Sequence, residues 1–96
     1  MLAAGRDDAL LRFTLGNAYL DDDPARAAEH LERAVALDPD YSAAWKSYGK
    51  ALAAAGRADD AAHAYRQGIE TATRKGDIQA AKEMRVFLRR LEKRSR

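Results

Sequence analysis

Apolar residues along this chain recur at spacings of three and four, the period of one face of an α-helix. The pattern is clearest over residues 42–75, where two such faces stand on either side of Gly56. Their members are Trp45, Tyr48, Leu52 and Ala55 before the glycine, and Ala61, Tyr65, Gly68, Ile69 and Ala72 after it. Glycine adopts the left-handed conformation that ends many helices at little cost. The stretch therefore predicts a helical hairpin that turns at Gly56.

The same period predicts three more helices. Their apolar faces consist of Leu11, Leu15, Ala18 and Tyr19; of Ala27, Leu31, Ala34 and Val35; and of Ile78, Ala81, Met84, Leu88 and Leu91. No alternating strand pattern competes with them. The sequence thus predicts an all-α fold of five antiparallel helices at about 6–21, 24–37, 41–55, 58–74 and 78–94.

Capping residues mark where the helices begin and end. Asp23 is a good N-cap and Pro24 suits a first helical position, while Asp77 is the expected N-cap of the last helix. Asp38 or Asp40 can cap the third helix. Arg74, Lys75 and Gly76 form a typical C-terminus, with two cations at the negative end of the helix dipole and then glycine.

The first two helices repeat the pattern of the central hairpin. Gly16 lies 33 positions before Gly49, and Leu31 lies 34 positions before Tyr65, so the first turn is one residue shorter. A rival register compares residues 3–9 with 54–61, which makes the first helix equivalent to the second helix of a hairpin. We prefer the first register because Asp23 and Pro24 then open the second helix directly.

The repeated residues resemble the signature of the tetratricopeptide repeat (TPR) family, a pair of helices named A and B in 34 positions. The residues that carry the resemblance are Leu15, Gly16, Tyr19, Ala27, Leu31, Ala34 and Pro39, followed by Trp45, Tyr48, Gly49, Leu52, Ala61, Tyr65 and Gly68. Two departures are Arg12 at the position of Trp45, and Thr73 where the family has proline. The resemblance implies one TPR-like domain over 1–96, with repeat 1 at about 8–39, repeat 2 at 42–75 and a capping helix at 77–94.

Composition excludes several other classes of protein. The chain is 47% apolar and 33% charged, which is typical of a folded helical protein, and it has no cysteine for a disulfide or a thiolate metal site. No apolar run reaches the length of a signal peptide or the roughly 18 residues of a membrane span. We therefore expect a cytoplasmic protein without a membrane partner.

No pattern of catalytic or metal-binding residues stands out. Asp21, Asp22 and Asp23 lack the alternating ligands and central glycine of a calcium loop, and they suit a helix N-terminus better. His30 and His63 are too few and too widely spaced for a zinc site. Nucleophile-elbow, phosphate-loop and HExxH motifs are absent. The prediction is a protein that is not an enzyme and uses no cofactor or metal.

The resemblance implies a binding surface on the inner, concave face, which TPR proteins build mainly from A helices. On the first and third helices the candidates for this groove are Phe13, Asn17, Leu20, Lys46, Lys50 and Ala53. Aligning the last helix with the third at a shift of 36 residues adds Lys82, Val86 and Arg89. An apolar end and a row of cations suit a peptide or helix of a partner protein that carries acidic groups. An alternative for Phe13 is packing against residues 1–5. The carboxylate clamp of some TPR domains is not carried over, since Phe13 and Ser47 occupy two of its positions.

Two other functions compete with this one. The first is a homodimer or larger homo-oligomer with a scaffold role, because the open ends of helical repeats can stack. The second is nucleic-acid binding through residues 85–96, which hold six basic residues against Glu92, although the whole chain carries only +2. Nucleic acid is the least favoured partner, because only Phe87 offers a ring among the arginines. A solubilising outer face explains the basic tail more simply.

Overall fold

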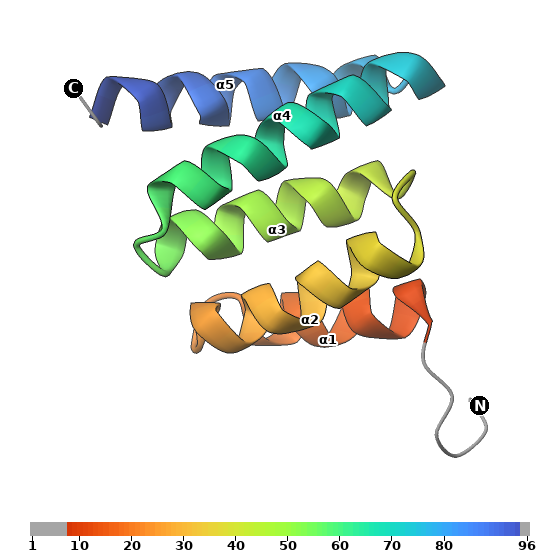
Figure 1. The fold of residues 1–96 in the computed structure, drawn as a ribbon, viewed down its shortest axis with the longest axis vertical. Helices are drawn as coiled ribbons and strands as arrows, with labels where there is room; N and C mark the ends of the chain where they lie inside the picture. Colours follow the sequence, from red (N-terminus) through yellow and green to blue (C-terminus); the bar gives the residue numbers. More distant parts are fainter. Residues whose placement is uncertain (1–7, 95–96) are drawn as a thin grey trace.

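The computed structural model describes residues 8–94 and shows five α-helices stacked in one direction (Figure 1). The helices are α1 (Ala9–Tyr19), α2 (Pro24–Leu37), α3 (Ser42–Ala54), α4 (Ala58–Lys75) and α5 (Ile78–Arg94). Within the described range there is no β-strand, so the predicted all-α fold is confirmed. Figure 1 shows the stack rising from α1 and α2 at the bottom to α5 at the top, with successive helices antiparallel.

The predicted helix boundaries are close to the observed ones, with one larger difference at α1. Its expected start at residue 6 lies outside the described residues, and it ends at Tyr19 instead of residue 21. The end comes early because the Leu20 N–H donates to the Asn17 carbonyl at 3.3 Å, a bond that tightens the last turn. Asp23, whose backbone is not helical, is the N-cap residue of the next helix.

Local side-chain bonds explain most helix starts. Asp8 accepts from the Leu11 N–H at 2.8 Å, and Asp23 accepts from the Arg26 N–H at 3.2 Å, with Pro24 in the first turn as predicted. Asp77 accepts from the Ala80 N–H at 3.3 Å and caps α5. These bonds satisfy backbone donors that the helices themselves leave unpaired.

The prediction for the start of α3 was wrong. Tyr41 is its N-cap residue and makes no side-chain capping bond. Asp38 instead accepts the N–H of Asp40 at 3.1 Å inside the preceding turn, which keeps its carboxylate away from α3.

Gly56 and Gly76 have the left-handed conformations that the sequence predicted. Their φ angles are 81° and 78°. A side chain at either position would strain the backbone, so these two glycines set the turns after α3 and α4.

The core runs the length of the stack between the helices. Its largest fully buried side chains are Leu31, Leu52 and Met84, one from each of α2, α3 and α5. Tyr65 joins them with 3% of its surface exposed, and burial raises the pKa of its hydroxyl to about 12. A smaller cluster of Ala34, Val35 and Ala44 packs α2 on α3. The contacts between the helices therefore combine large side chains with small ones.

Glycines inside the helices show which register is right. A Cβ on Gly16 would overlap the Leu31 side chain, and a Cβ on Gly49 would overlap the Tyr65 ring. Both hairpins thus have the same close contact between a glycine of the first helix and a large side chain of the second. The two glycines are 33 residues apart and the two large side chains are 34 apart, which confirms that α1 is an A-type helix. Gly68 provides the next close contact, where the Met84 side chain packs against α4.

Two residues predicted on packing faces are exposed, and several others, Trp45 among them, are only half-buried. Trp45 is half-buried, because its indole N–H reaches out to donate to the Pro39 carbonyl at 2.8 Å. Ala18 is exposed, as α1 is covered on fewer sides than α3. Ile78 has 65% of its surface exposed, because Ala80 is buried and lies about 200° around the helix from it.

Candidate functional site

One face of the stack is built from α1, α3 and α5, the helices at the A positions. These three helices contact one another in order, α1 with α3 and α3 with α5. The other two, α2 and α4, lie between them along the stack and form the opposite side (Figure 1). We call the surface of α1, α3 and α5 the concave face, as the sequence analysis did.

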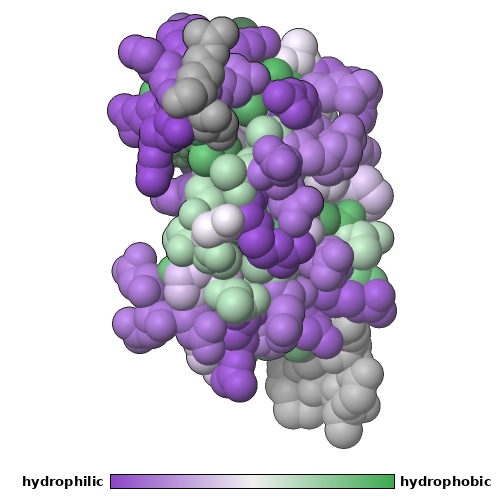
Figure 2. Space-filling model, turned by 60° about the vertical axis from the view of Figure 1, so that its left-hand side comes forward, coloured by the Kyte–Doolittle hydropathy of each residue, from purple (hydrophilic) through white to green (hydrophobic). Residues whose placement is uncertain are grey.

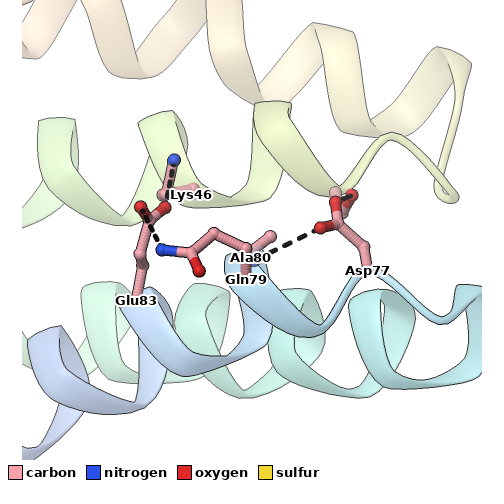
Figure 3. Close-up of polar contacts among 6 residues, drawn as sticks. Lys46, Asp77, Gln79, Ala80 and Glu83 are labelled. Carbon is pink, nitrogen blue, oxygen red and sulfur yellow. Dashed lines mark hydrogen bonds and ion pairs between the residues drawn. The ribbon is translucent and has the colours of Figure 1, made fainter.

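Polar contacts join α3 to α5 along this face (Figure 3). The Lys46 ammonium lies 2.6 Å from a Glu83 carboxylate oxygen, and the other oxygen of Glu83 accepts from Gln79 at 3.2 Å. The Ser42 hydroxyl donates to Asp77 at 3.2 Å. Both contacts join residues 35–37 positions apart, so α3 and α5 run in the same direction.

These contacts show which side of α5 faces α3. The helices begin at Ser42 and Ile78, which agrees with the predicted shift of 36 residues. Lys50 lies over the Phe87 ring, at 5.8 Å from its centroid, just as Lys46 meets Glu83. Glu83 and Phe87 therefore face α3. Since successive residues are about 100° apart around a helix, Lys82, Val86 and Arg89 point away from α3. All three are exposed.

On α5 the part of the concave face that meets α3 consists of Glu83, Phe87 and Arg90. They were not among the predicted residues because the alignment carried over only the positions equivalent to Lys46, Lys50 and Ala53. The residues that face those three from the next helix lie one position further along the chain.

The α1 end of the face is less open than predicted. The Phe13 ring packs on Tyr41, with centroids 4.8 Å apart, and both Phe13 and Leu20 pack against the core. Asn17 lies between them in sequence and is exposed. The alternative contact of Phe13 with residues 1–5 falls outside the described residues.

The charge of the face is also more balanced than a row of cations. Hydrogen bonds from Lys46 and then Gln79, together with the Lys46 charge, lower the pKa of Glu83, which keeps it ionised at neutral pH. Lys46 is therefore neutralised by an internal partner. Lys50 and Arg90 remain as exposed cations of the concave face.

Metal and membrane chemistry find no support in the described part of the chain. Between residues 8 and 94, no group of three or more His, Asp or Glu side chains could hold a metal ion. His30 contacts Arg12 at 3.0 Å and stacks on Tyr19 at 5.7 Å, so it belongs to the first hairpin and not to a pair with His63. None of the described helices has the length and apolarity to cross a membrane.

Stacked antiparallel hairpins with glycines at the A-to-B contacts define the class of helical-repeat proteins. The model of the tetratricopeptide repeat family matches residues 18–84, and the chain belongs to this family.

Relatives agree with that assignment. A TPR repeat-containing protein of Pseudomonas aeruginosa is 58% identical over 94 residues, covering 97% of this chain and 90% of the relative. A Bordetella parapertussis protein with a solution structure is 45% identical, with a TM-score of 0.83, over 98% of this chain and 83% of that one. A TPR domain protein of Salinibacter ruber is 32% identical, with a TM-score of 0.80, over 90% and 88%.

Proposed function

We propose that this protein is a non-enzymatic interaction module that binds a peptide or helix of a partner protein on its concave face. TPR folds generally act as protein-interaction modules, and the concave face offers half-buried apolar side chains beside exposed polar ones. The observation that supports the proposal most is the contact of Lys50 with Phe87 across α3 and α5, with the exposed Asn17 at the position of α1 that matches Lys50, 33 residues earlier. Such an arrangement suits a ligand that crosses the A helices.

The sharpest experiment compares two lysines with opposite placements. Lys50 lies on the concave face, whereas Lys82 lies on the outer side of α5, and both are exposed on helices. Proteins captured from a bacterial lysate by the wild type would be compared with those captured by Lys50→Glu and by Lys82→Glu. The two variants change net charge equally, so any difference between them reports position and not charge.

The proposal predicts that Lys50→Glu loses a partner that Lys82→Glu keeps. The fold of each variant would be checked by circular dichroism. Loss from Lys82→Glu alone would overturn the concave-face proposal and move the site to the outer side of α5. Equal capture by all three proteins would also contradict it, and sedimentation of the wild type would then test the homo-oligomer alternative.

A further inference from the structure

A surface hollow lies where the last turns of α5 meet the turn between α3 and α4. It has two connected parts, of about 250 Å³ and about 130 Å³, which share Ala53, Leu91 and Arg94. Gly56 and Ala58 line the first part, and Tyr65, Phe87 and Arg90 line the second. Figure 2 shows the side of the molecule that carries the α3–α4 turn, with a pale green, weakly hydrophobic patch at mid-height bordered by purple.

The floor of this hollow is apolar and its charges have one sign. Phe87 and Ala53 are half-buried, and Leu91 has only 7% of its surface exposed. Among residues 8–94, the only charged residues that line it are Arg90 and Arg94. Neither guanidinium group forms an ion pair or hydrogen bond within that range.

A neighbouring hollow on the other side of Leu91 provides a contrast. It measures about 360 Å³ and is lined by Asp59, Arg66 and Glu92 among others. There Arg66 pairs with Glu92 at 3.2 Å, so the charges are already balanced within the chain. The hollow with Arg90 and Arg94, in contrast, has no acidic residue among the described residues that line it.

We propose that this hollow anchors a segment of a partner protein in which an aliphatic side chain is flanked by acidic ones. The aliphatic group would cover Ala53, Phe87 and Leu91, and carboxylates would pair with the two arginines, which stand one helical turn apart. Lys50, stacked over Phe87, adds a third cation where the hollow opens onto the concave face. The proposal rests on the proposed function, since the segment would continue along that face.

The chain provides a matched control for this hollow. Arg90 and Arg94 line it, while Arg89 and Lys93 precede each by one residue and are exposed on another side of α5. Arg90→Gln/Arg94→Gln and Arg89→Gln/Lys93→Gln therefore remove the same charge at the same spacing. The probe is a blocked synthetic peptide, Asp-Glu-Leu-Glu-Asp, titrated into ¹⁵N-labelled full-length protein and followed by NMR.

The expected result is a set of shift changes at Ala53, Leu91 and Arg94. Arg90→Gln/Arg94→Gln should weaken binding about five- to tenfold, whereas Arg89→Gln/Lys93→Gln should change it by less than about twofold. Replacing the central leucine of the peptide by serine, or all its acids by amides, should also weaken binding.

Several outcomes would overturn the proposal. Equal weakening by the two double variants would mean general charge attraction. Shift changes confined to Asn17, Lys46 and Lys50 would refute the hollow but leave the concave-face function standing. A short oligothymidylate that produces the same shifts at lower concentration than the peptide would assign the hollow to nucleic acid instead. Absence of any shift would refute this ligand chemistry, and the lysate comparison would still decide the proposed function separately.

Discussion

The hairpins α1–α2 and α3–α4 carry the same repeat pattern but bury it to different extents. In α1 only Gly16 is buried, whereas α3 buries six residues, among them Gly49, Ala51 and Leu52. The reason is position: α3 packs against α2, α4 and α5, while α1 packs on α2 and touches α3. A signature residue therefore stabilises the fold by an amount that depends on its place in the stack.

Equivalent positions show the difference directly. Trp45 packs on both core clusters, whereas Arg12, at the same place in α1, contacts His30 through its guanidinium. Tyr65 fills the space beside Gly49 with a ring, and Leu31 fills the space beside Gly16 with a smaller side chain. The following predictions test this comparison, beginning with the largest expected effect.

Removing the central ring should be the most damaging change. Tyr65→Ala leaves a cavity between α3, α4 and α5, and should lower the free energy of unfolding by about 3–5 kcal/mol. Leu31→Ala should cost about 2–4 kcal/mol, because a smaller side chain is lost. Urea unfolding followed by circular dichroism measures both, with Tyr65→Phe as the control that keeps the ring. A smaller loss from Tyr65→Ala than from Leu31→Ala would contradict the comparison.

Trp45 and Arg12 form the second pair. Trp45→Ala should cost about 2–3 kcal/mol, from a half-buried indole and its bond to the Pro39 carbonyl. Arg12→Ala should cost less, about 1 kcal/mol, because the side chain that is lost is polar and partly exposed. Thermal melts of both variants provide the check. Equal melting temperatures would show that the two hairpins do not differ at this position.

The close-contact glycines should differ less. Gly49→Ala pushes a methyl group into the rigid Tyr65 ring and should cost about 1–2 kcal/mol after the better helix propensity of alanine is included. Gly16→Ala meets the fully buried Leu31 side chain, which is smaller than the Tyr65 ring and lies in the less buried hairpin, so its cost should stay at about 1 kcal/mol. Chemical unfolding resolves such a difference. A larger loss of stability from Gly16→Ala than from Gly49→Ala would contradict the greater burial of the α3–α4 hairpin.

The smallest effect concerns pH and the contact between α3 and α5. The folded-state pKa of Glu83 is lowered from about 4.5, chiefly by its hydrogen bond with Lys46. Its stabilising contribution is therefore fully present above the unfolded-state pKa and is lost as the pH falls through the folded-state pKa. Glu83→Gln should be less stable than the wild type at pH 7, and the difference should vanish as the pH falls through the lowered pKa of Glu83. A difference that grows towards low pH would contradict the ion pair.

The sequence predicted the helices well because their signals are local. Each capping signal acts within a few residues of its helix. Spacing alone therefore located the starts of α2 and α5, at Asp23 and Asp77, and the ends of α3 and α4, at Gly56 and Gly76.

The site was harder to predict because it depends on distant residues. Nothing within one helix indicates that Lys46 meets Glu83, because the side chains that face each other across α3 and α5 do not occupy equivalent positions of the repeat. Phe13 looked available because its partner Tyr41 lies 28 positions further along. The concave-face role of Asn17, Lys50 and their neighbours stays a prediction.

The order of helix contacts has a consequence for folding kinetics. Among the described helices, each touches only its next or next-but-one neighbour along the chain. Few contacts therefore close long loops, and chains of such low contact order fold in microseconds to milliseconds. Because nothing ties the first helix to the last, opening can begin at one end and stop part-way. Amide hydrogen exchange should accordingly be fastest in α1 and slowest in α3 and α4, and a partner that crosses the A helices would slow exchange at the ends most.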